Sequence, residues 1–124
     1  MRIRIPIKDY DSLRTEIRRR AHRGEWNTWE TIEVGTKTKV ERLVHVPKDD
    51  DQYKDIQLKL VNPTADDIKA NILYLDIIPI VVVGSKLTES QRKEKKAIVL
   101  GRFSEILNRY FPKIMGYRVI LKEK

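Results

Sequence analysis

The chain contains no cysteine, and this is the first of several absences that narrow what the protein can be. Without thiols it has no disulfide framework and no thiolate-bound zinc, and a cytoplasmic location is the expected one. The longest apolar run, residues 77–83, is far too short to span a bilayer, so no membrane contact is expected. Apolar residues alternate with other residues over residues 1–7, so this segment lacks the continuous apolar stretch of a secretory signal.

The sequence also lacks internal repeats, low-complexity segments and linkers. Its 124 residues are about the length of one domain. The composition, 40% apolar and 35% charged, is that of a folded protein. We therefore expect a single domain over residues 1–124.

Positive charge is abundant and unevenly distributed, and the formal net charge is +8. Residues 1–24 hold eight basic and three acidic side chains, and residues 85–124 hold eleven and four. Residues 25–84 hold seven basic and eleven acidic side chains. A cationic surface attracts polyanions, above all nucleic-acid phosphates, although many basic domains carry their charge only for solubility. DNA or RNA is therefore the favoured partner.

Apolar periodicity predicts an α+β fold. Alternation predicts strands over residues 3–7, 28–34, 37–46, 55–61 and 117–122. Helical spacing predicts one helix from Asp9 or Asp11 to about residue 22, and a second over residues 88–111. The order β-α-β-β-β-β-α-β indicates one mainly antiparallel sheet of five or six strands, with both helices packed on one face. Pro6, which lacks a donor, should lie on an edge strand or turn its nitrogen outward.

Residues 64–76 support two interpretations. Thr64 and Asp67 have the spacing of a helix cap, and a helical stripe continues from them. The β-branched residues that follow favour a strand over residues 68–78, separated by Pro79 from a short buried run at 80–83. We favour the strand, and the choice stays open.

The second helix has the clearest local signals. A capping box joins Thr88 to Gln91, and Pro112 ends the helix. Its apolar stripe begins only at Val99, because Arg92 and Lys96 occupy the same arc in the first two turns. We therefore expect the start of this helix to project past the core into water.

The leading functional hypothesis is a non-catalytic nucleic-acid-binding domain that grips phosphates with cationic helix faces. It requires the two basic helices to lie side by side on one surface. An exposed indole could stack on a base, although both tryptophans are also natural core residues. The expected contact residues are Arg18, Arg19, Arg23, Trp26, Arg92, Lys93 and Lys96.

Two other functions stay open. In a small endonuclease, His22 and His45, the only histidines, would act as general base and acid, with Glu41 orienting His45. A metal-dependent version would use the aspartates of loop 47–52, but Gln57 stands where a second carboxylate is needed. No metal and no cofactor is therefore expected. In a protein-interaction module of viral, antitoxin or immunity type, a partner or a second copy would bind at an edge strand or at the acidic middle of the chain.

Overall fold

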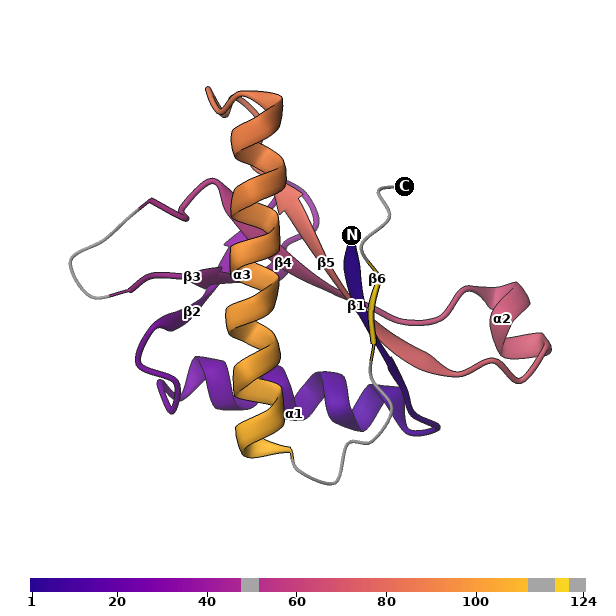
Figure 1. Ribbon diagram of the computed structural model, residues 1–124. Coiled ribbons are helices and arrows are strands. Elements are labelled where there is room, and N and C mark those ends of the chain that lie inside the picture. The colour runs from indigo at the N-terminus through magenta and orange to yellow at the C-terminus, as the bar shows by residue number, and fades with distance from the viewer. Residues whose placement is uncertain (48–51, 112–117, 121–124) are drawn as a thin grey trace.

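The computed structural model describes residues 1–47, 52–111 and 118–120 (Figure 1). Its elements follow the expected order with one addition, the short helix α2. They are β1 (Arg2–Pro6), α1 (Tyr10–His22), β2 (Trp29–Val34), β3 (Val40–His45), β4 (Ile56–Val61), α2 (Ala65–Lys69), β5 (Tyr74–Val81), α3 (Glu89–Tyr110) and β6 (Arg118–Ile120). No helix among these residues is both long and apolar enough to cross a membrane.

The strands form one antiparallel sheet in the order β2-β3-β4-β5-β1-β6. The first strand of the chain therefore lies inside the sheet, between β5 and β6. The described pairing of β1 with β6 ends at Arg4, and Pro6 lies beyond that residue. Pro6 has no backbone N–H to donate, but this absence interrupts no described pair with β6. The edges are β2 and β6, where an added strand from a partner would have to pair.

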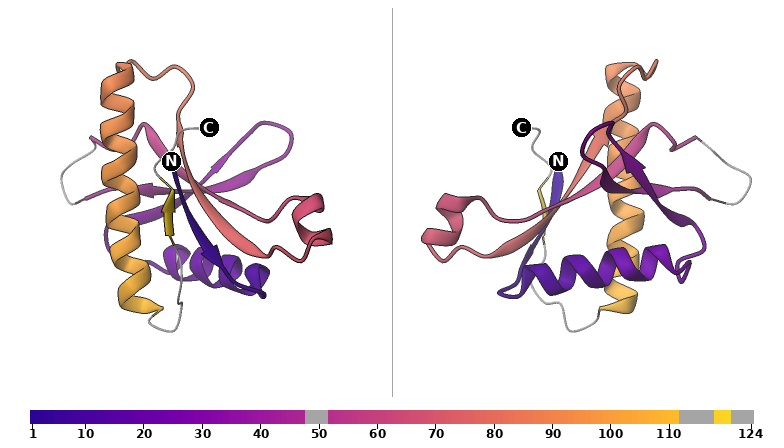
Figure 2. Two further views of the ribbon diagram at one scale, coloured as in Figure 1. Left: turned by 45° about the vertical axis from the view of Figure 1, so that its right-hand side comes forward. Right: turned by 180° about the vertical axis from the view of Figure 1, so that it is seen from behind.

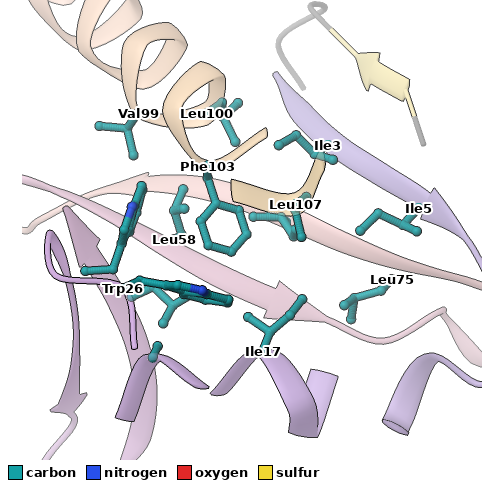
Figure 3. Packing of buried hydrophobic residues seen from close by; sticks show 14 of the residues in the cluster. Ile3, Ile5, Ile17, Trp26, Leu58, Leu75, Val99, Leu100, Phe103 and Leu107 are labelled. Atoms are coloured by element: carbon teal, nitrogen blue, oxygen red, sulfur yellow. The ribbon is translucent and has the colours of Figure 1, made fainter. Parts of the chain in front are cut away.

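Both helices pack on the same face of this sheet, as expected. Alternate residues of neighbouring strands point to that face, so that Ile3 of β1 pairs with Ile77 of β5, and Ile5 with Leu75. The helices cross at a steep angle, and their side chains meet over the strands (Figures 2 and 3). The buried cluster between them includes Leu13, Ile17, Trp29, Leu43, Leu58, Val99, Leu100, Phe103 and Leu107.

The preferred strand over residues 68–78 is wrong in its first part. Thr64 caps a helix, because its hydroxyl accepts a hydrogen bond from the Asp67 backbone N–H at 3.1 Å. The chain stays helical through Lys69, and β5 begins only at Tyr74. Ile68 and Ile72, whose apolar character favoured a strand, are 44% and 51% exposed. Here the local cap decides the structure, since no buried surface is available to hold a strand.

The expectation that Pro79 separates this strand from a short run at residues 80–83 is also wrong. Pro79 lies within β5 and pairs with Leu58 of β4. Described pairing of β5 with β1 ends at Ile77, so from there β5 has β4 as its only neighbour in the sheet. The missing N–H of a proline is tolerated at such a position.

Candidate nucleic-acid interface

The start of α3 projects past the ends of the strands, as the late onset of its apolar stripe predicts (Figures 1 and 2). A capping box holds this end. The Thr88 hydroxyl accepts from the Gln91 backbone N–H at 3.2 Å, and the Gln91 side chain accepts from the Thr88 backbone N–H at 2.9 Å. The first buried residue of the helix is Val99. The first turns are therefore a rigid extension into solvent.

Three of the expected contact residues meet on this extension. Arg92, Lys93 and Lys96 line a shallow hollow of about 390 Å³ together with Glu89. Arg92 and Lys93 are exposed. Neither forms an ion pair with any carboxylate of the described residues. Arg92 and Lys93 therefore carry positive charge that no ion pair with a described residue offsets.

Sequence reasoning missed a second row of cations on the same helix. Lys95, Arg102 and Arg109 recur every seven residues, which places them on one side of α3 at steps of about 10 Å. Lys95 donates to the Gln52 carbonyl at 2.6 Å, and the Arg102 guanidinium lies 5.0 Å from the ring centre of Tyr53. The seven-residue spacing was the signal available in the sequence. We call Arg92, Lys93, Lys95, Lys96, Arg102 and Arg109 the α3 cations.

His45 is hydrogen-bonded to Arg102, one of the α3 cations. Its side chain is buried, with Nε2 2.9 Å from Nη1 of Arg102 and Nδ1 3.1 Å from the Thr28 carbonyl oxygen. A guanidinium can only donate, so Nε2 accepts and the proton of a neutral imidazole sits on Nδ1. The ring also stacks on Trp29, with centres 4.5 Å apart. His45 is thus a satisfied core residue whose nitrogens are both occupied.

The three residues proposed for catalysis do not form one site. His22 is exposed at the end of α1, with Nδ1 3.3 Å from the Thr31 hydroxyl. Glu41 accepts from Nε of Arg18 at 2.8 Å, and this hydrogen bond lowers the pKa of the Glu41 carboxyl. Glu41 also lies four residues before His45 on β3, a separation of about 13 Å. The prediction that Glu41 orients His45 is therefore wrong.

The arginines in the last two turns of α1 lie beside carboxylates. Arg18 pairs with Glu41, and Arg19 pairs with Glu16, as does Arg20. The hydrogen bonds from Arg19 and Arg20 lower the pKa of Glu16 from 4.5 to about 2. Just past the helix, Arg23 lies 3.9 Å from Glu25. The expected contact residues of α1 are therefore largely neutralised within the protein.

The basic start of α3 does not lie beside α1, which corrects the expectation that the two basic helices lie side by side along their length. The end of α1 lies at the far end of α3: the Arg20 guanidinium is 5.1 Å from the ring centre of Phe111, which follows α3. Arg92 lies 18 residues before Tyr110, the last residue of α3, about 27 Å along the helix. Figures 1 and 2 show the projecting turns of α3 and helix α1 at opposite ends of the molecule.

Trp26 is not a stacking platform for a base. It is 3% exposed, and its ring packs against Phe103 at 6.0 Å and Tyr110 at 5.9 Å between centres. Trp29 is 2% exposed. The alternative interpretation, in which both tryptophans belong to the core, is the one that the structure shows; Figure 3 shows Trp26 within this cluster.

The acidic loop proposed for a metal falls largely on residues 48–51, outside the described residues. Nearby, the Asp55 carboxylate accepts from the Ser85 hydroxyl at 3.1 Å. In the part of the chain that the structure describes, no three acidic or histidine side chains gather as a metal site would require. No protein-family model, no curated protein and no solved structure matches the chain, so its chemistry has to be inferred from its own residues.

Proposed function

We propose that the protein binds nucleic acid through the phosphate backbone, with α3 as the contact element. The observation that carries the proposal is a contrast between the two basic helices. Arg92, Lys93 and Arg109 of α3 are exposed and form no ion pair within the described residues, whereas Arg18 and Arg19 of α1 are paired. A cation paired with a carboxylate must give up that partner before it binds a phosphate, and an unpaired one need not.

The dimensions of α3 suit such a role. From Arg92 to Arg109 the helix rises about 25 Å, a length along which a nucleic-acid strand presents several phosphates. Contacts of this kind fix the position of the backbone but do not distinguish bases. Because Trp26 and Trp29 are buried, neither offers a face for stacking. We therefore expect binding with little sequence preference.

Fluorescence anisotropy with labelled single- and double-stranded DNA and RNA tests the proposal. We expect binding at low salt, with an affinity that falls linearly on a log–log scale as salt rises, since bound cations release counterions from phosphates. Failure to bind any of the four probes at low salt, or an affinity indifferent to salt, contradicts the proposal.

A matched pair of double variants tests the assignment to α3. Arg92→Gln with Lys93→Gln removes two unpaired charges, and Arg19→Gln with Arg23→Gln removes two charges that lie beside Glu16 and Glu25. Each lost phosphate contact lowers the salt slope by about one unit. We expect the α3 variant to lower the slope by about two units and the α1 variant to leave it nearly unchanged. Equal losses in the two variants contradict a specific role for α3.

A further inference from the structure

A separate cavity of about 360 Å³ opens between α1 and the strands β2, β3 and β4. None of its lining residues belongs to α3, so it is distinct from the proposed nucleic-acid interface. Leu43 and Leu58, both buried, and Leu60, which is partly buried, give it an apolar lining. Its volume lies within the range of pockets that take small organic molecules.

One polar group of this cavity has no partner. The Nε atom of Arg14, on α1, is buried and has no hydrogen-bond acceptor among the described residues. Its neighbour one turn later, Arg18, is bound to Glu41 at 2.8 Å, and Lys39 lies 3.9 Å from Glu33. A buried N–H without an acceptor is unfavourable. Arg14 is therefore the group in this cavity whose hydrogen bonding the fold leaves incomplete.

The charge of the lining favours an anion. Three basic side chains, Arg14, Arg18 and Lys39, and two acidic ones line it, and both acidic ones already face a cation. Arg42 and Lys59 also belong to the lining, but their side chains alternate with the leucines of β3 and β4 and point to the opposite face of the sheet. A guanidinium edge, formed by Nε–H and one Nη–H, matches the two oxygens of a carboxylate. The leucines beside the guanidinium suit the apolar part of a carboxylate-bearing molecule.

We propose that this cavity binds a small organic carboxylate with an apolar body. Arg14 receives the carboxylate through its Nε–H edge, and Leu43, Leu58 and Leu60 contact the rest of the molecule. At roughly 30 Å³ for each water of the liquid, the cavity has the volume of about a dozen waters. The proposal does not depend on nucleic-acid binding, because the two sites share no residue.

Titration of the whole chain with 2-naphthoate, followed by ¹H–¹⁵N NMR, tests this proposal. The method detects arginine Nε–H groups as well as backbone amides. We expect saturable shifts of the Arg14 Nε–H and of the Leu43, Leu58 and Leu60 amides. The neutral 2-naphthamide should bind at least about tenfold more weakly, because it cannot form a charge-assisted pair. No saturable binding of the carboxylate, or equal binding of the amide, overturns the proposal.

Two variants on the same helix region separate a specific effect from a general loss of charge. Arg14→Gln should weaken 2-naphthoate binding at least about tenfold. Arg23→Gln removes the same charge outside the cavity lining and should leave the affinity unchanged. Wild-type affinity in Arg14→Gln, or an equal loss in Arg23→Gln, overturns the proposal. Should Arg14→Gln fail to fold, the comparison of naphthoate with naphthamide on the wild-type chain still decides.

Discussion

At the residue scale, the tryptophans that could have stacked on nucleic-acid bases are instead part of the hydrophobic core. Phe103 is fully buried and meets Trp26 and Trp29 edge-on, with ring centres 6.0 and 5.0 Å apart. Edge-to-face pairs of this kind add to the stabilisation from burial alone. The side chain of Phe103 therefore joins α3 to the segment that links α1 and β2.

Replacing Phe103 with alanine should lower the free energy of unfolding by about 3–5 kcal/mol, because the lost ring leaves a cavity between two tryptophans. Urea unfolding followed by tryptophan fluorescence measures the change. Ile68→Ala serves as a control, because Ile68 is 44% exposed and should change stability by less than about 0.5 kcal/mol. A loss below about 1 kcal/mol in Phe103→Ala would contradict the packing described for it.

At the element scale, α1 and α3 show how two helices of the same general character acquire different electrostatics. Both are amphipathic and basic. In α1, Glu16 lies three and four residues before Arg19 and Arg20 and pairs with both, and Arg18 reaches across to β3. The first turns of α3 extend beyond the strands, and Arg92 and Lys93 form no ion pair with any described carboxylate. Spacing within α1 pairs Arg19 and Arg20, and the position of α1 beside β3 pairs Arg18.

Glu16 gives a pH dependence that can be measured. Because its pKa in the folded protein is about 2, below the ordinary 4.5, its ion pairs stabilise the folded state above about pH 4.5. That contribution is lost as the pH falls through this range toward 2. We expect wild type to be more stable than Glu16→Gln at pH 6, and the two to converge near pH 2. Urea unfolding at several pH values tests this, and a difference that stays constant with pH contradicts it.

At the scale of the whole molecule, one buried cluster joins both long helices to strands on either side of the sheet centre. It reaches from Ile3 on β1 to Trp29 on the edge strand β2. The short helix α2 stays outside this cluster and has no buried residue. A cluster shared by all the large elements favours cooperative unfolding, since no large part of the chain keeps a core of its own.

We therefore expect a single unfolding transition. Far-ultraviolet circular dichroism, which reports mainly on α1 and α3, should change at the same urea concentration as fluorescence from Trp26 and Trp29. Substitution of Ala65 or Lys69 of α2 should leave this midpoint nearly unchanged, because both side chains are exposed. Two separated transitions would show that the helices and the sheet are independent units.

Much of the fold was predictable because its determinants are local. Asp9 and Thr88 cap their helices with their own side chains. Alternation in residues 3–7 and 55–61 marks strands with one buried face. The segment 64–76 could not be decided in this way, since its apolar residues fit a helix or a strand and only burial distinguishes them. Ile68 and Ile72 are exposed, which is a property of the whole fold.

The candidate site was predictable only in part. The charges of Arg92, Lys93 and Lys96 and their place before the apolar stripe are readable from spacing. Spacing does not reveal that Trp26 is buried or that His45 contacts Arg102. It also does not reveal that the Arg14 Nε–H lacks an acceptor among the described residues. The sequence by itself determined the α+β class, the element order and which helix face is basic, because propensity, capping and periodicity act over a few residues. Local spacing also pairs Arg19 and Arg20 with Glu16 inside one helix. Only the tertiary structure decided that Arg18 pairs with Glu41, because β3 is brought beside α1 by the fold.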